Sequence, residues 1–313
     1  MNARRHADPM SPDALTDRGH LPTERANPAT AGLDRLDTLA AVDLMNREDA
    51  TVAAAVATQR ERIAAAVELA ADALAGGGRV IYVGAGTSGR LGALDAAECP
   101  PTFHTRPEQV QAIIAGGPAA MFAAVEGAED DAAAGADAVD SKYVNSSDLV
   151  FGIAAGGTTP FVLSALRRAR ELGARTAFLA CVPGPDDLAD VCIRPVTGPE
   201  VLTGSTRLKA GTATKMVLNT VSTLAMVRLG KVHRNLMVDL RATNAKLWDR
   251  AARIVAELTG TTRSHALTLL QSAGGRVKTA LVMEWIGCPA DEADRRLAAA
   301  GGRVSAILSE KAS

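Results

Sequence analysis

A glycine-rich loop between an apolar run and a helical segment is the clearest chemical feature of the sequence. The segment Gly84–Gly89 has the pattern Gly-x-Gly-x-x-Gly and carries two hydroxyl side chains, Thr87 and Ser88. Backbone N–H groups at the start of a helix, together with such hydroxyls, bind phosphate groups. We therefore predict that Gly86, Thr87 and Ser88 contact a phosphate. The alternative is a plain strand-to-helix turn whose glycines only permit close packing.

Two common uses of such a loop do not fit the residues around it. A dinucleotide-binding fold needs Asp or Glu at the end of its second strand for the ribose hydroxyls, but Ala115-Gly116-Gly117 stands there. An ATP-binding loop ends in Lys followed by Ser or Thr, whereas Gly89 is followed by Arg90 and Leu91. The ligand predicted from the loop is therefore a small molecule with a single phosphate group.

The other reactive side chains form no metal or disulfide motif. The 5 histidines have no paired spacing, and the 4 cysteines lie far apart without a Cys-x-x-Cys pair. This distribution disfavours a structural zinc site and a disulfide framework. We expect no metal, no cofactor, and thiols that are buried or inert.

The composition excludes several classes of protein. The 313 residues include 34 Lys and Arg against 35 Asp and Glu, and aromatic residues are scarce, with 5 Phe, 2 Tyr and 2 Trp. The chain therefore offers neither a broad basic field nor stacking platforms for nucleic acid. No apolar run approaches the roughly 18 to 20 residues of a membrane span. Because residues 1–20 mix charges with prolines and have no apolar core, they do not resemble a signal peptide, and we expect a cytoplasmic protein.

Apolar strands alternate with helices along most of the chain, after two helices between residues 33 and 75. The short β-rich runs are at 79–83, 110–115, 149–155, 175–181 and 191–193. This pattern predicts an α/β fold with a parallel sheet covered by helices on both faces and ligands at the carboxyl ends of the strands. We expect a largely disordered tail over 1–30, the α/β domain over 31–248, and a small helical subdomain over 249–313, where glycines separate short helices.

Several longer blocks resemble the N-acetylmuramic acid 6-phosphate etherase family. The first block runs from Gly84 to Phe103 and contains Glu98-Cys99-Pro100-Pro101. Further blocks follow in the family's order, at 115–117, 124–131, 198–213, 235–239 and 242–244. The similarity extends from about Thr23 to the C-terminus and implies a sugar isomerase (SIS) domain, a three-layer αβα sandwich.

Two segments depart from the family pattern. Gly156-Gly157-Thr158-Thr159-Pro160 stands where Ser-Gly-Arg-Thr-Pro is usual, so a hydroxyl and a guanidinium are lost from a loop near the sugar phosphate. Thr23-Glu24 with Asn27-Pro28 resembles the family's N-terminal signature, but Arg25-Ala26 stands where an Arg directly before Asn is more usual. Neither change affects an acidic position.

The resemblance implies cleavage of the D-lactyl ether of N-acetylmuramic acid 6-phosphate to N-acetylglucosamine 6-phosphate and D-lactate. With the sugar ring open, a carboxylate can remove the proton on carbon 2 and a carboxylic acid can protonate the departing ether oxygen; water then adds across the double bond. This chemistry needs no metal and no redox cofactor. The family also implies a homodimer, with no nucleic acid or membrane as partner.

Two glutamates match active-site positions of the family. The resemblance implies that Glu98 is the catalytic proton donor and Glu129 the second active-site glutamate, with Glu126 as a near competitor of Glu129. Because a Pro-Pro pair follows Cys99, we expect the helix after the loop to end there, which places Glu98 near the bound sugar. Without the family pattern, Glu98 is a surface carboxylate at a helix end and Glu129 belongs to a solvated acidic run.

Three polar residues before and at the start of the last long helix are further candidates for substrate contact: Ser205, Thr206 and Lys209. The two hydroxyl residues could equally be helix N-caps, and Lys209 could be a surface charge. Phosphate anchoring matters because binding energy at carbon 6 can position carbons 2 and 3 for reaction.

Two other functions share parts of the pattern. A non-catalytic sugar-phosphate sensor resembling the glucokinase regulatory protein contains this type of domain, but such regulators carry two of them in one chain. An aldose–ketose sugar-phosphate isomerase also contains it, but the block Glu98–Pro101 is unlike what such an isomerase is expected to have. The etherase function therefore fits the sequence best.

Overall fold

The computed structural model describes residues 19–312, so part of the tail expected over 1–30 lies outside the described residues. Residues 22–35 contain three short 3-10 helices, Pro22–Glu24, Pro28–Thr30 and Leu33–Arg35. Thr23 and Thr30 are buried, and the Thr30 hydroxyl donates to the carbonyl oxygen of Val201 at 2.9 Å. The chain is therefore packed against the rest of the protein from about residue 22.

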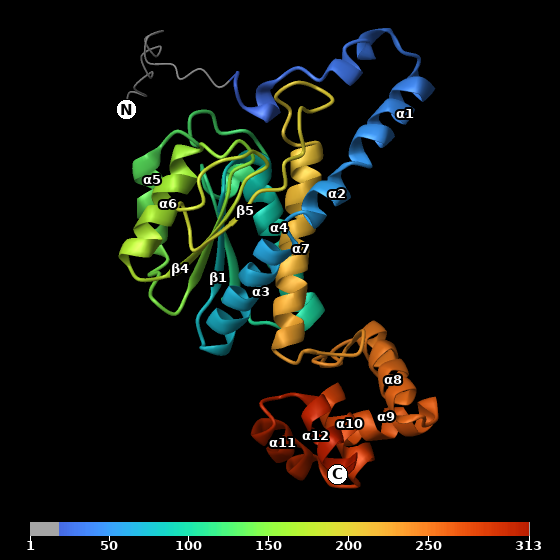
Figure 1. Ribbon diagram of the computed structural model, residues 1–313. Helices are drawn as coiled ribbons and strands as arrows, with labels where there is room; N and C mark the ends of the chain where they lie inside the picture. Colours follow the sequence, from blue (N-terminus) through green and yellow to red (C-terminus); the bar gives the residue numbers. More distant parts are fainter. Residues whose placement is uncertain (1–18, 313) are drawn as a thin grey trace, which may run out of the picture.

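A five-stranded parallel sheet with the order β2-β1-β3-β4-β5 forms the centre of the fold (Figure 1). Its strands are β1 (Val80–Gly84), β2 (Val110–Ile114), β3 (Leu149–Ile153), β4 (Arg175–Leu179) and β5 (Val191–Ile193). Gly84 at the end of β1 pairs with Ile114 and Ile153, so the carboxyl ends of three strands are level. All residues of β1 and β3 are buried, as expected for a parallel sheet covered on both faces.

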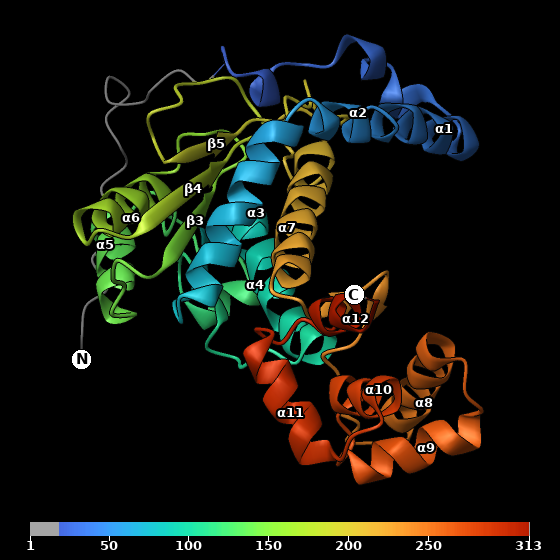
Figure 2. The ribbon, with the colours of Figure 1, turned by 60° about the horizontal axis from the view of Figure 1, so that its bottom comes forward.

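Helices cover both faces of the sheet, which confirms the predicted three-layer sandwich (Figure 2). One layer contains α3 (Arg60–Ala75), α4 (Gly86–Phe103) and α7 (Lys209–Arg228), and the other contains α5 (Ala132–Ser141) and α6 (Pro160–Glu171). Side chains of β1 alternate between the two layers. Tyr82 belongs to the core under α3, α4 and α7, whereas Ile81 and Val83 belong to the core under α5 and α6.

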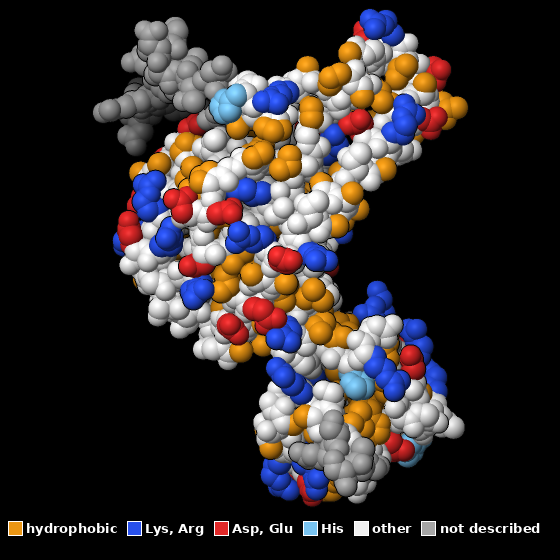
Figure 3. All heavy atoms as spheres, in the orientation of Figure 1, with side chains coloured by type: hydrophobic (Ala, Val, Ile, Leu, Met, Phe, Trp, Pro, Cys, Tyr) orange, Lys and Arg blue, Asp and Glu red, His pale blue; other side chains and the backbone are white. Residues whose placement is uncertain are grey.

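The segment before α3 forms an arm that projects from the sandwich. Instead of the two helices expected between 33 and 75, the chain forms α1 (Thr38–Asp49), α2 (Val52–Ala57) and α3. Of the residues in α1, only Leu44 is buried, and Leu39 is 72 % exposed. Figure 1 shows α1 extending away from the sheet, and Figure 3 shows hydrophobic side chains on its surface.

The chain beyond α7 forms a short hairpin and then a group of helices. The hairpin pairs β6 (Val232–His233) with β7 (Leu236–Met237). The helices are α8 (Ala245–Thr259), α9 (Arg263–Ser272), α10 (Val277–Ile286), α11 (Ala290–Ala299) and α12 (Val304–Ala312). They share a hydrophobic core of their own, and they lie near the carboxyl ends of α4 and α7 (Figure 2).

Candidate active site

A cavity of about 260 Å³ lies at the carboxyl end of the sheet, between the loops that follow β1 and β3. Its lining comes from five segments of the chain: Leu21 and Glu24; Ala85–Ser88; Glu129; Ile153, Ala155, Gly156, Thr158 and Thr159; and Gly204 and Thr206. This is the edge at which open parallel sheets bind ligands. The cavity therefore contains the glycine loop that the sequence singled out.

The glycines of the first loop allow a close approach between strand and helix. A Cβ atom on Gly89 would lie 2.7 Å from the carbonyl oxygen of Gly84 and 2.6 Å from Cγ1 of Ile114. Gly86 has φ of 51° and starts α4, and no side chain caps that end of the helix. The first N–H groups of α4 are thus available next to the hydroxyls of Thr87 and Ser88, an arrangement that can hold a phosphate.

Glu129 lines the same cavity, and its backbone is held by α6. Its carbonyl oxygen accepts a hydrogen bond of 3.0 Å from the N–H of Phe161, in the first turn of α6. Glu129 also lines a neighbouring cavity of about 160 Å³, which Glu126 shares. Because Glu126 does not line the larger cavity, the geometry favours Glu129 over its competitor.

The loop that departs from the family pattern lies at the cavity. Thr158 and Thr159 line it, and α6 begins directly afterwards at Pro160. The Thr159 side chain makes no capping hydrogen bond to α6, so its hydroxyl is available to a ligand. These two threonines stand in the loop that the sequence identified, although they were not among the predicted site residues.

Glu24 is a lining carboxylate that the sequence interpretation did not select. The N–H of Gly204 donates to the carbonyl oxygen of Thr23 at 3.1 Å, which holds the N-terminal segment over the cavity. A Cβ on Gly204 would lie 3.2 Å from a carboxylate oxygen of Glu24. The resemblance of Thr23-Glu24 to the family's N-terminal signature was the available signal.

The three candidates before and at the start of α7 have different surroundings. Thr206 lines the cavity, whereas Ser205 and Lys209 do not. Neither hydroxyl residue is the N-cap of α7, which is Leu208. Instead, the Glu200 carboxylate accepts from the N–H groups of Lys209 and Ala210, both at 2.9 Å. Burial raises the pKa of Glu200, and these two N–H donors oppose the rise.

Lys209 is neither a surface charge nor, in this structure, a group that faces the cavity. Its side chain is 4 % exposed and its Nζ lies 2.7 Å from a carboxylate oxygen of Glu48 in α1. The hydrogen bond from Lys209 lowers the pKa of Glu48, although partial burial opposes this effect. The amide of Asn27 donates to the same carboxylate at 2.8 Å. Lys209 therefore joins α7 to the N-terminal arm.

The expectation that α4 ends at Cys99 is wrong. The helix continues through Pro100 and Pro101 to Phe103, where His104 terminates it in a left-handed conformation with φ of 52°. The N–H of His104 donates to the carbonyl oxygen of Pro100 at 2.9 Å, and Phe103 is buried. Two prolines in the last turn remove only two helical hydrogen bonds, and the buried phenyl ring holds that turn in place.

Glu98 does not line the cavity of its own chain, contrary to the expectation that it lies near the bound sugar. It follows Thr87 by about three turns of α4, a distance of about 16 Å along the helix axis. Glu98 is exposed to solvent and does not line the cavity. The structure thus brings together Gly86, Thr87, Ser88, Thr206 and Glu129, and it separates Glu98 from them.

A buried carboxylate fixes α4 against its neighbours. Asp95 accepts hydrogen bonds from the hydroxyl of Tyr82 at 2.8 Å, the amide of Asn219 at 2.6 Å and the hydroxyl of Ser222 at 3.0 Å. These donors come from β1 and α7. Burial, together with the charge of Asp95, raises the pKa of Tyr82 well above its usual value, so the phenol remains a donor. The position of Glu98 on α4 is therefore rigidly defined.

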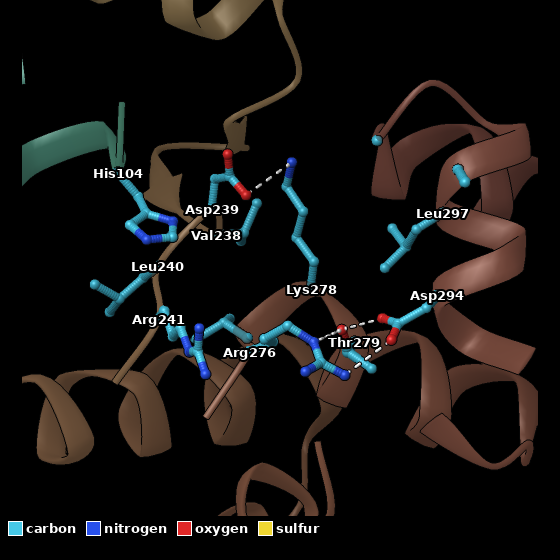
Figure 4. Close-up of a pocket in the computed structure, with 13 residues that line it drawn as sticks. His104, Val238, Asp239, Leu240, Arg241, Arg276, Lys278, Thr279, Asp294 and Leu297 are labelled. Atoms are coloured by element: carbon cyan, nitrogen blue, oxygen red, sulfur yellow. Dashed lines mark hydrogen bonds and ion pairs between the residues drawn. The ribbon is translucent and has the colours of Figure 1, made fainter. Parts of the chain in front are cut away.

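A second cavity, of about 340 Å³, lies between the end of α4 and the C-terminal helices (Figure 4). Two ion pairs line it, Lys278 with Asp239 at 3.4 Å and Arg276 with Asp294 at 2.8 Å. His104 also lines this cavity rather than the one with the glycine loop. Burial lowers the pKa of Lys278, and Asp239 opposes the shift. These pairs connect β7 and the helices that follow it.

Within residues 19–312, no three His, Cys, Asp or Glu side chains gather in a way that could hold a metal ion. In the same part of the chain, no helix combines the length and the apolar character that crossing a bilayer requires. On the face shown in Figure 3, basic and acidic side chains are interspersed.

Comparisons with known proteins match both parts of the chain. Residues 62–170 match the N-terminal SIS domain of the glucokinase regulatory protein, and residues 234–278 match its C-terminal lid domain. Among solved structures, the NanR protein of Vibrio vulnificus complexed with ManNAc-6P is 18 % identical, with 60 % of this chain and 65 % of that chain covered and a TM-score of 0.38.

The curated relatives are much more similar and cover nearly the whole chain. Proteins from Synechocystis sp. and Gloeobacter violaceus are 54 % and 55 % identical, with 94 % and 95 % of this chain covered and 97 % of each relative. A protein from Mycolicibacterium smegmatis is 54 % identical over 93 % of this chain and 99 % of its own. All three are named N-acetylmuramic acid 6-phosphate etherase. The chain belongs to the N-acetylmuramic acid 6-phosphate etherase family.

Proposed function

We propose that this protein cleaves the D-lactyl ether of N-acetylmuramic acid 6-phosphate, giving N-acetylglucosamine 6-phosphate and D-lactate, in the recycling of cell-wall amino sugars. The observation that carries the proposal is a cavity lined both by the start of α4, with Thr87 and Ser88, and by Glu129, in a chain of this family. The reaction is a carbon–oxygen lyase reaction followed by hydration.

The phosphate binds at the start of α4, where backbone N–H groups and the hydroxyls of Thr87 and Ser88 contact it. Thr206 and the loop with Thr158 and Thr159 complete the binding site. Anchoring carbon 6 in this way places carbons 2 and 3 toward Glu129. Glu129 removes the proton from carbon 2 of the open-chain sugar. The electron pair of that C–H bond then makes the single bond between carbons 2 and 3 a double bond, while the bond from carbon 3 to the ether oxygen breaks.

The departing lactate oxygen takes a proton from a carboxylic acid, the role assigned to Glu98. Water then adds its hydroxyl to carbon 3 while a proton returns to carbon 2, so hydration restores the amino sugar. A positioned acid or base contributes roughly 10²- to 10⁴-fold to such a step. The division of roles between the two glutamates rests on the family pattern.

The direct test is to incubate the pure protein with N-acetylmuramic acid 6-phosphate and to assay D-lactate. Reaction in heavy-oxygen water should place the label at carbon 3 of the sugar, and label in lactate would contradict elimination followed by hydration. Glu129→Gln should lower turnover by at least about 100-fold, whereas the matched variant Glu126→Gln should retain most of it. The reverse ranking would exchange the roles of these two glutamates.

The regulator alternative predicts a different result from the same assay. A sugar-phosphate sensor would bind the substrate in calorimetry and release no lactate. The regulator alternative is supported by the matches to the SIS and lid domains of the glucokinase regulatory protein. The near full-length similarity to etherases favours turnover.

The proposal also includes the organisation and location of the protein. We propose a SIS domain over residues 31–248 and a small helical subdomain over 249–313. The C-terminal helices share a hydrophobic core, which also takes in Val238, Leu240 and Ala242 from the segment before them. We expect a cytoplasmic homodimer. Free cysteines at positions 99, 181, 192 and 288 agree with a reducing compartment, and light scattering at working concentration checks the dimer.

A further inference from the structure

The proposed substrate carries a second negative charge besides its phosphate, the carboxylate of the lactyl group. The cavity of about 260 Å³ offers no basic side chain to this carboxylate, because none of the residues that line the cavity is Lys or Arg. A carboxylate that leaves water without a charged or hydrogen-bonding partner is strongly disfavoured. The lactyl carboxylate therefore needs a partner outside that cavity.

A smaller cavity of about 160 Å³ adjoins the first one at the start of α4. The two cavities share three lining residues, Ala85, Gly86 and Glu129. Glu129 is the proposed base for carbon 2, and the lactyl ether leaves from the neighbouring carbon 3. A sugar whose phosphate binds at Thr87 and Ser88 in the larger cavity can thus extend its lactyl group past Glu129 into the smaller one.

Arg90 is the only Lys or Arg among the described residues that line the two cavities. It lies one turn beyond Gly86 on α4, about 6 Å along the helix axis. Nε of Arg90 donates to the carbonyl oxygen of Met121 at 3.1 Å, and Nη2 donates to that of Ala123 at 3.3 Å. The backbone of the segment that follows β2 therefore holds the guanidinium in place.

The guanidinium keeps hydrogen-bonding capacity for a ligand. The two carbonyl oxygens use only some of its N–H groups, and within residues 19–312 no carboxylate forms an ion pair with it. A guanidinium matches a carboxylate well, since two of its N–H groups can bind the two oxygens together. Because the backbone already fixes Arg90, little side-chain freedom is lost when a carboxylate binds.

We propose that the 160 Å³ cavity is the lactyl subsite and that Arg90 binds the lactyl carboxylate of the substrate. This proposal rests on the proposed function. The phosphate and the carboxylate then hold the substrate at two points, with carbons 2 and 3 between them at Glu129. The product N-acetylglucosamine 6-phosphate has no lactyl group and leaves the subsite empty, so Arg90 selects the ether substrate over this product.

Two glutamates line the same subsite and oppose an anion there. Glu126 is exposed, so water and salt screen its charge. Glu129 becomes neutral when it takes the proton from carbon 2, which removes its repulsion of the lactyl carboxylate at the step in which the ether bond breaks. The attraction to Arg90 is then least opposed in the transition state, where it accelerates the reaction.

Calorimetry with two ligands separates this role of Arg90 from its support of the loop. A Glu129→Gln background suppresses turnover, and N-acetylmuramic acid 6-phosphate and N-acetylglucosamine 6-phosphate are titrated into it with and without Arg90→Gln. Arg90→Gln should weaken binding of the first ligand by about 10- to 100-fold, because a charge-assisted hydrogen bond is lost, and binding of the second by less than about threefold. Equal weakening of both ligands, or of neither, would overturn the proposal.

Arg167→Gln is the matched control for the change in net charge. Arg167 is an exposed residue of α6 that lines neither cavity, so its replacement should leave the binding of both ligands unchanged. A control that weakened the first ligand as much as Arg90→Gln would trace the effect to net charge and contradict the subsite.

A neutral analogue tests the role of the charge without any change in the protein. The lactyl carboxamide of the substrate has nearly the same shape and no negative charge, so the wild type should convert it with a kcat/KM about 10- to 100-fold lower than that of the acid. Equal kcat/KM values for acid and amide would refute the assignment of Arg90, even if Arg90→Gln failed to fold. A wild type that released no D-lactate from the acid would instead refute the proposed function.

Discussion

The ion pair between Lys209 and Glu48 joins segments that are 161 residues apart in the chain. Nζ lies 2.7 Å from the carboxylate, and the exposed fractions of the two side chains are 4 % and 17 %. Asn27 donates to the same carboxylate. Removing this negative charge should therefore loosen the attachment of the N-terminal arm to α7 and lower the stability of the protein.

The expected size follows from the burial of Lys209. Breaking a buried pair by removing one partner costs about 3–5 kcal/mol, because the remaining charge is left without compensation. Glu48 keeps some contact with water, and the amide oxygen of Gln can still accept a hydrogen bond. We therefore expect Glu48→Gln to lower the free energy of unfolding by about 2–3 kcal/mol, below the full range for a buried pair.

Urea unfolding followed by circular dichroism measures this change. The double variant Glu48→Gln/Lys209→Met should recover at least half of the loss, because it removes the uncompensated ammonium and keeps an apolar chain of similar length. Glu68→Gln is the matched control, since the Glu68–Arg228 pair has similar geometry but lies on the surface, where such pairs contribute little. A loss for Glu48→Gln no larger than that of the control would refute the reasoning.

The same pair predicts a pH dependence. The hydrogen bond from Lys209 holds the pKa of Glu48 below its usual value, so the stabilisation is fully present above the unfolded pKa of about 4.3 and is lost as the pH falls through the lowered native pKa. The difference in stability between wild type and Glu48→Gln should be constant from pH 6 to 8 and shrink below about pH 4. A difference that stays unchanged at pH 3 would contradict this assignment.

Two further predictions concern the thiols and the glycine loop. Burial raises the pKa of Cys99 and Cys181 to about 12, so both thiols remain protonated at pH 8. Iodoacetamide should therefore modify the partly exposed Cys288 in the native protein and reach Cys99 and Cys181 only after unfolding. Mass spectrometry that finds modified Cys99 in native protein would contradict this prediction. Gly89→Ala should push α4 away from β1, because the new Cβ would lie 2.7 Å from the Gly84 oxygen. Calorimetry with N-acetylglucosamine 6-phosphate should then show at least roughly tenfold weaker binding. The control variant Gly32→Ala, whose Cβ meets only the end of the Arg35 side chain, should bind this ligand normally.

The sheet and the position of the glycine loop at its carboxyl end could be predicted because their signals are local. Each buried strand is a continuous apolar run that ends near glycine or a polar loop, and the parallel arrangement follows from the helices between strands. The close packing of Gly89 on Gly84 then explains why glycine occupies both positions. The grouping of Gly86, Thr87 and Ser88 follows directly from their place after β1.

The end of α4 could not be predicted from the Pro-Pro pair alone. A proline disfavours helical geometry in the residue before it, but the buried ring of Phe103 lies beyond both prolines and favours one more turn. This tertiary contact outweighs the local preference. The separation of Glu98 from the glycine loop does not depend on where the helix ends, because Glu98 follows Thr87 by 11 helical residues in either case.

The surroundings of Lys209 were equally inaccessible, since Glu48 and Asn27 come from distant segments. Glu24 differs, because its position in the family's N-terminal signature was visible but carried no local chemical reason. The sequence therefore identified the residues of the glycine loop and also Glu129 and Thr206, which line the same cavity. It did not identify contacts between distant segments, such as the ion pair of Lys209 with Glu48.

The cavity at the glycine loop is lined without basic side chains. Among the residues that line it, none is Lys or Arg, and the loop that usually contributes an Arg in this family has Thr158 at the corresponding place. A phosphate held there relies on N–H groups, hydroxyls and the dipole of α4, which act over short distances. Binding should consequently depend on the exact position of the loop more than on ionic strength, in contrast to a site built from mobile basic side chains.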